Sequence, residues 1–174
     1  TLLTGVVIAR YLGPEKMGIW TLLLLIPGYA EAFGRLQLDT SSVYFIGKGK
    51  IKLGEVAFIL HLVSMIMVSV IALVGFLNID FLHNQIFENV EMDVQEFIYG
   101  VFLIIPLRFI YINYSYLLIA REEIKAYNKL VIIQALTTSA LSIGMIMLMD
   151  FGILGALMGS ILGLLISIIY GISK

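Results

Sequence analysis

Long apolar stretches, separated by polar connections, recur along this sequence. A helix that crosses a membrane needs about 20 consecutive, mostly apolar residues. The apolar runs here are continuous, whereas a strand of a membrane barrel alternates apolar and polar positions over about ten residues. We therefore predict an all-α fold, a polytopic transmembrane helix bundle, with complete spans at 18–38, 53–76, 97–119, 127–149 and 153–172.

The first apolar stretch, residues 1–12, is too short to cross a membrane. Gly13 and Pro14 follow it directly and predict a break between two helices. A signal peptide would require a basic segment before the apolar run, and the sequence has none there. We interpret residues 1–12 as the second half of a helix that begins before this sequence, and we expect Trp20 at the membrane–water interface.

Composition narrows the class of protein. Of the 174 residues, 60% are hydrophobic and 13% are charged, whereas soluble domains carry roughly 25% charged residues. A soluble globular domain is therefore excluded. The lack of cysteine excludes disulfides, thiolate nucleophiles and Cys-ligated zinc. The net charge of −1, without a long basic run, argues against nucleic acid as a partner.

The sequence also lacks the motifs of common membrane enzymes. His61 and His83 are its only histidines, and the patterns HExxH, DDxxD and GxSxG do not occur. Every connection except 77–96 is short, which leaves no soluble domain for a separate catalytic site. We expect neither an enzyme, nor a cofactor, nor a metal site.

The distribution of Lys and Arg predicts the orientation in the membrane. Seven of these residues lie in the connections 39–53 and 120–129 and at the C-terminal end, and two, Arg10 and Lys16, lie on the other side. Positively charged connections remain in the cytoplasm. We therefore predict that 39–53 and 120–129 are cytoplasmic, and that 77–96, with five acidic residues and no Lys or Arg, is external.

Three sequence motifs carry a resemblance to a known family. The run ARYLGPEKMGIW at 9–20 resembles the signature aRyLGpeeyGly of the polysaccharide transport family. The run RLQLDTSSVYFI at 35–46 is similar to the family's rLGLDtavvRyia, although Gln37 replaces a glycine and Tyr44 replaces an arginine. The run DFGILGA at 150–156 is similar to the family's lGilGaa turn. The family belongs to the flippase superfamily that also contains the multidrug and toxin extruders.

The resemblance implies a fold and a function. Residues 1–174 would form most of the N-terminal lobe of a flippase with about twelve to fourteen helices, and the C-terminal lobe would lie outside this sequence. The implied activity is the movement of an oligosaccharide linked to undecaprenyl pyrophosphate across the cytoplasmic membrane by alternating access, with possible proton or sodium coupling. A cation-coupled drug or toxin extruder of the same superfamily is the alternative.

Arg108 is the clearest candidate for a functional residue. It lies 11 residues into the span 97–119, which places it roughly 16 Å from the outer end, close to the middle of the bilayer. An ionised side chain at that depth is costly and needs a reason. A guanidinium presents a fork of donors that suits phosphate oxygens, such as those of a pyrophosphate headgroup. The alternative is a structural arginine paired with a neighbouring carboxylate.

Glu31 and Arg35 are four residues apart on the span 18–38, so they share a face and could simply neutralise each other. Glu31 lies roughly 20 Å from the outer end, within a turn of the depth of Arg108. We therefore predict that a network of all three is possible, with Arg35 and Arg108 as candidate substrate-binding residues. Glu31, which could bind a proton, and Asp39 are the candidate ion-coupling residues, and Asp39 is alternatively an interfacial residue.

Other features of the spans are expected to serve packing. His61 is predicted to form a hydrogen bond in the packing, with a proton relay as the alternative. Asn113 and Gln134 are predicted to form hydrogen bonds between helices, with substrate contacts as the alternative. Small residues at 155, 159 and 163 predict a close helix–helix contact. Two prolines within spans, Pro27 and Pro106, predict kinks. Three tyrosines of the span 97–119 are expected to line a sugar path or to anchor the helix at the interface: Tyr111, Tyr114 and Tyr116.

Overall fold

A computed structural model of the chain describes residues 2–35, 41, 43–44, 46, 52–87, 90 and 94–174. Its elements are helices only: α1 (Leu2–Gly34), α3 (Leu53–Leu77), α4 (Ile79–Ile86), α5 (Gln95–Ala120), α6 (Ile124–Met149) and α7 (Gly152–Ile172). Within the described residues, all of these helices except α4 are long and apolar enough to cross a membrane. The predicted all-α transmembrane bundle is confirmed, and the chain is a multi-pass membrane protein.

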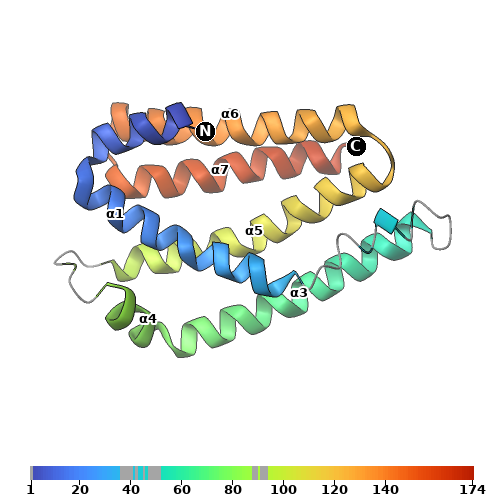
Figure 1. Ribbon diagram of the computed structural model, residues 1–174, viewed down its shortest axis with the longest axis horizontal. Coiled ribbons are helices and arrows are strands. Elements are labelled where there is room, and N and C mark those ends of the chain that lie inside the picture. The colour runs from blue at the N-terminus through green and yellow to red at the C-terminus, as the bar shows by residue number, and fades with distance from the viewer. Residues whose placement is uncertain are drawn as a thin grey trace.

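Helix α1 consists of two helical segments that meet at Gly13. This glycine has φ 77° and ψ 169°, a backbone conformation that residues with a Cβ rarely adopt. Pro14 follows and has no N–H to continue the hydrogen-bond ladder. Figure 1 shows the chain reversing direction here, so that the segment before Gly13 lies beside α6 and the segment after it crosses towards α5. The predicted break is confirmed, but the second segment begins at Pro14 rather than residue 18.

Helices α6 and α7 form a tightly packed antiparallel pair (Figure 1). A Cβ built at Gly155 would lie 3.1 Å from the backbone N of Ile146, and one at Gly159 would collide with the backbone and hydroxyl of Ser142. A Cβ at Gly163 would collide with Thr138. These glycines therefore allow the two backbones to approach, as their spacing predicts.

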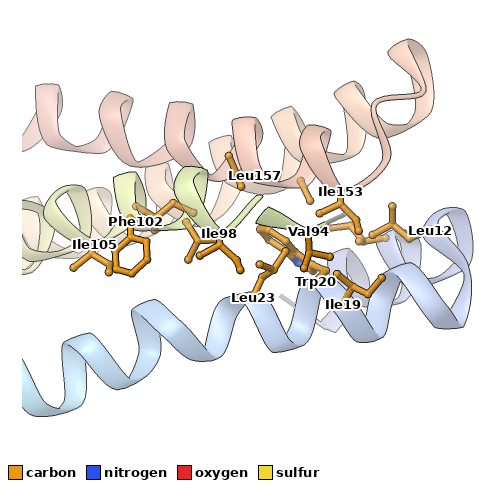
Figure 2. Packing of buried hydrophobic residues seen from close by; sticks show 14 of the residues in the cluster. Leu12, Ile19, Trp20, Leu23, Val94, Ile98, Phe102, Ile105, Ile153 and Leu157 are labelled. Atoms are coloured by element: carbon orange, nitrogen blue, oxygen red, sulfur yellow. The ribbon is translucent and has the colours of Figure 1, made fainter. Parts of the chain in front are cut away.

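The apolar core lies where α1, α5 and α7 meet (Figure 2). Trp20 and Leu23 of α1 pack in the same buried cluster as Ile98 of α5 and Ile153 of α7. The expectation that Trp20 anchors the chain at the interface is wrong, because its side chain is only 6% exposed. It points from α1 towards the other two helices, so contact with protein replaces contact with lipid headgroups.

Helices α3 and α4 lie at the edge of the bundle (Figure 1). α3 packs mainly on α5, and it leaves many of its large apolar side chains exposed. The sequence did not predict α4, which lies in the connection 77–96. Its Ile79 and Leu82 pack against the core, while Asp80 and Asn84 are exposed, so this short helix is amphipathic.

Candidate functional site

Three charged side chains, from α1, the residue directly after it and α5, meet in the bundle. Arg108 Nη2 of α5 lies 2.7 Å from Glu31 Oε2 of α1, and Arg35 Nη1 lies 3.3 Å from Glu31 Oε1. One carboxylate therefore joins two guanidiniums. The structure contains the three-residue network that depth and spacing predict; we call Glu31, Arg35 and Arg108 the charge cluster.

A glycine lets α1 come close enough to its neighbours to form the charge cluster. A Cβ at Gly34 would lie 2.7 Å from Cζ of Phe109 and 2.9 Å from Cδ1 of Ile71, both too short for a real contact. Gly34 is three residues from Glu31, and Phe109 is next to Arg108. The close approach thus occurs at the level of the ion pair and fixes its position.

The charge cluster lies beside the middle of α5, where Arg108 meets Glu31 of the last turn of α1. Arg108 is 13 residues after Gln95 and 12 before Ala120, which is about 20 Å and 18 Å along the helix axis. The side chains of Glu31, Arg35 and Arg108 are 20%, 26% and 37% exposed. Because ionised groups at this depth avoid hydrocarbon, the open side of the charge cluster is suited to a water-filled cavity.

The balance of charge in the cluster is positive. Two guanidiniums face one carboxylate, so these three residues carry a net charge of +1. The guanidinium of Arg35 also lies 5.3 Å from the ring centroid of Tyr116, a cation–π geometry that restrains it. Arg108 has donors beyond the one that meets Glu31. An anion could therefore bind to the remaining donors of Arg108 without displacing Glu31.

The remaining predicted coupling residue, Asp39, lies outside the residues that the structure describes. The same holds for Gln37 and for most of the connection 39–53. Tyr44 is described and exposed. The geometry of the candidate site therefore rests on Glu31, Arg35 and Arg108.

Asn113 links α5 to α3 next to the charge cluster. Its side chain is 5% exposed, its Nδ2 donates to Ser64 Oγ at 3.0 Å, and it reaches the carbonyl oxygen of Leu60 at 3.5 Å. The predicted interhelical hydrogen bond of Asn113 is confirmed. A cavity of about 20 Å³, lined in part by Arg35, Ser64 and Asn113, joins this polar pair to the charge cluster. It is large enough for one water molecule.

Sequence analysis did not single out Ser64. The available signal was its spacing of three residues from His61 on the otherwise apolar α3. A serine is common in membrane helices, so this signal is weak without the partner on α5.

His61 and Gln134 bond within their own helices. His61 Nδ1 lies 2.8 Å from the carbonyl oxygen of Ala57, and its ring stands edge-on to Tyr114 at 5.4 Å. The amide of Gln134 donates to Thr138 Oγ1 at 3.5 Å, one turn further along α6. The prediction that Gln134 bonds to another helix is therefore wrong for the described residues, because its amide meets Thr138 on the same face of its own helix.

An open apolar groove of about 560 Å³ lies between α1, α3, α4 and α5. Its wall on α1 includes Ala30 and Gly34, which flank Glu31 in sequence. Val70 and Val74 of α3 and Phe102 of α5 form other parts of the wall. A hydrocarbon chain could lie in this groove while a polar group reaches the charge cluster.

The described residues contain no group of three His, Cys, Asp or Glu side chains that could hold a metal ion. Comparison of the chain with protein families, with characterised proteins and with solved structures found no match.

Proposed function

We propose that this chain forms part of a flippase that moves an oligosaccharide linked to a polyprenyl pyrophosphate across the cytoplasmic membrane. The observation that carries the proposal is the charge cluster beside the middle of α5, whose three side chains carry a net charge of +1 and are partly exposed. A site of this kind suits an anionic headgroup that must cross the hydrocarbon layer. The motifs at 9–20, 35–46 and 150–156 support the same class of substrate.

The three charged residues have different roles in this proposal. Arg108 binds the pyrophosphate directly, since its side chain is the most exposed of the three. Arg35, held by Glu31 and Tyr116, adds a second positive charge behind it. Glu31 positions both guanidiniums.

Glu31 also provides a route to proton coupling. Protonation of its carboxylate would raise the charge of the cluster from +1 to +2, because both guanidiniums stay ionised. The anionic headgroup would then bind more tightly when the proton is bound. Because the affinity for the headgroup would then depend on whether Glu31 carries a proton, transport would be linked to the proton gradient. Asp39 remains a second candidate for this role.

The helices offer the flexibility that alternating access requires. Pro27 lies one turn before Glu31, and Pro106 lies two residues before Arg108. Each proline removes one backbone hydrogen bond from its helix. We propose that α1 and α5 bend at these positions, with 39–53 and 120–129 on the cytoplasmic side and 77–96 outside.

A cation-coupled extruder of drugs or toxins is the second candidate. The carboxylate of Glu31 inside the span favours it, because such a group can bind a cationic compound. However, this carboxylate already meets two guanidiniums, and the resulting positive charge repels cations. The flippase is therefore the better fit to the charge cluster.

The test is translocation by the intact protein in vesicles. A polyprenyl-pyrophosphate-linked oligosaccharide is placed in one leaflet, and its arrival in the other is followed with an impermeant lectin. We expect the protein to accelerate transfer and Arg108→Ala to abolish the acceleration. Lys16 is an exposed cation at the start of the second segment of α1, and Lys16→Gln should leave the acceleration intact. Failure to accelerate transfer, together with uptake of a cationic dye, would identify the extruder instead.

A further inference from the structure

A second charged site lies at the end of the bundle where α5 ends, α6 begins and α7 ends (Figure 1). Here the structure has an open cleft of about 550 Å³. Its walls are the α5–α6 turn, the first turns of α6 and the last residues of α7, and they include Glu122, Ile124, Lys125, Lys129, Tyr170 and Lys174. None of these residues belongs to the charge cluster.

Arg121 connects the two sides of this cleft. Its Nη1 donates to the backbone carbonyl oxygen of Lys174 at 2.8 Å, and its Nη2 meets Glu123 Oε1 at 2.5 Å. Glu122, between them, has a left-handed backbone with φ 60°. The bond to Lys174 attaches the turn to the end of α7, and the ion pair with Glu123 lies within the turn.

The cleft holds more positive than negative charge. Lys125, Lys129 and Lys174 line it, and none of them lies within 4.0 Å of a carboxylate among the described residues. Arg121 neutralises Glu123. Among the described carboxylates that line the cleft, this leaves Glu122 without an ion pair. Lys125 and Lys129 are four residues apart on one face of α6, where like charges repel each other. An anion between the lysines would relieve this repulsion.

The position of the cleft indicates which anion it can receive. Three membrane-spanning helices begin or end here, at Ala120, Ile124 and Ile172, so the cleft lies at the level of the lipid headgroups. Ile124 is 51% exposed beside it, and Tyr170 supplies an aromatic ring with Lys174 Nζ 6.0 Å from its centroid. An apolar edge next to three ammonium groups suits a molecule that has both a phosphate and a hydrocarbon chain.

We propose that this cleft binds the headgroup of an anionic phospholipid, with Lys125, Lys129 and Lys174 contacting the phosphate and the acyl chains lying outside Ile124. The inference does not depend on the transported substrate. It would hold for any membrane protein with this arrangement of lysines.

The test is lipid binding by the purified, intact protein, measured by native mass spectrometry. Titration with phosphatidylglycerol and with phosphatidylcholine gives the ratio of the two affinities. We expect phosphatidylglycerol to bind about ten to a hundred times more tightly, given the contribution of each lysine near a membrane surface. The triple variant Lys125→Gln, Lys129→Gln, Lys174→Gln should reduce the ratio to near one.

A matched control removes three exposed cations elsewhere, through Arg10→Gln, Lys16→Gln and Lys52→Gln, and should keep the ratio. The single change Glu122→Gln should raise the affinity for phosphatidylglycerol, a gain that misfolding cannot produce. The proposal is overturned if the triple variant keeps its preference, or if the control loses as much. It is also overturned if inorganic phosphate displaces the lipid at equal concentration, because the site would then recognise a soluble anion.

Discussion

Removal of Arg108 should weaken substrate binding much more than it weakens the fold. Glu31 meets Arg108 at 2.7 Å and Arg35 at 3.3 Å, so Arg108→Ala leaves the carboxylate with one guanidinium. Loss of a partner from a fully buried pair costs about 3–5 kcal/mol, whereas exposed pairs contribute roughly 0.2–1 kcal/mol. Because the Arg108 side chain is 37% exposed and Glu31 keeps Arg35, we expect a loss of about 1–2 kcal/mol in stability.

The expected effect of the same substitution on binding is larger. A hydrogen bond to a charged group contributes about 1.5–3 kcal/mol, and the net charge of the cluster falls from +1 to zero. We predict that affinity for a polyprenyl pyrophosphate decreases roughly 10- to 150-fold, since about 1.4 kcal/mol corresponds to a factor of ten. Arg108→Lys should recover part of this affinity, because the ammonium keeps the charge but loses the planar fork.

Isothermal titration of the intact protein in detergent measures the affinity, and thermal unfolding measures the stability. The decisive variant combines Arg108→Met with Glu31→Met. It removes both partners of the Arg108–Glu31 pair together, so neither is left without the other. Arg35 keeps its charge of +1 and its contact with the ring of Tyr116. We expect restored stability with weak binding. A double variant that binds and translocates like the wild type would refute the role of Arg108 in binding and leave the ion pair as a structural feature.

Three further predictions concern coupling, packing and orientation. Glu31→Gln fixes the charge of the cluster at +2, so the affinity for pyrophosphate should stop rising as the pH falls. The repulsion that this change removes, between the carboxylate and a phosphate about 6 Å away, is about 3 kcal/mol. Binding titrations of the variant that still show the wild-type dependence on pH would exclude Glu31 as the coupling group. Gly159→Ala should destabilise the α6–α7 pair by about 1–3 kcal/mol in thermal unfolding. The control Gly144→Ala should not destabilise it, because a Cβ at Gly144 meets nothing within 4 Å. Equal effects of the two substitutions would refute the role of Gly159 in helix packing. In intact cells, an impermeant thiol reagent should label Asn84→Cys and not Ala126→Cys, and the reverse pattern would overturn the predicted orientation.

The sequence predicts the features that depend on one helix or on depth alone. The lengths of the apolar runs predict the spans, and Gly13 with Pro14 predicts the reversal in α1, because backbone geometry restricts which residues fit there. The charge cluster is also predictable. Glu31 and Arg35 share a face, and counting residues from the outer end brings Arg108 to the same depth.

Features that depend on the choice of neighbouring helix are not predictable in this way. Trp20 has a sequence position typical of an interfacial aromatic, yet it is buried because α1 turns that face towards α5 and α7. Gln134 has a partner in its own helix, and the contact between Arg35 and Tyr116 joins residues 81 positions apart. Periodicity places a side chain on a face of its helix, but packing decides what that face meets.

The guanidinium of Arg108, near the middle of α5, is proposed to receive a pyrophosphate. The most direct measurement is an experimental structure of the intact protein with a polyprenyl pyrophosphate bound. We expect a phosphate oxygen about 2.7–2.9 Å from a guanidinium nitrogen of Arg108, with Glu31 still in contact with Arg35. A pyrophosphate bound elsewhere, with the open side of the charge cluster closed by another part of the protein, would contradict it.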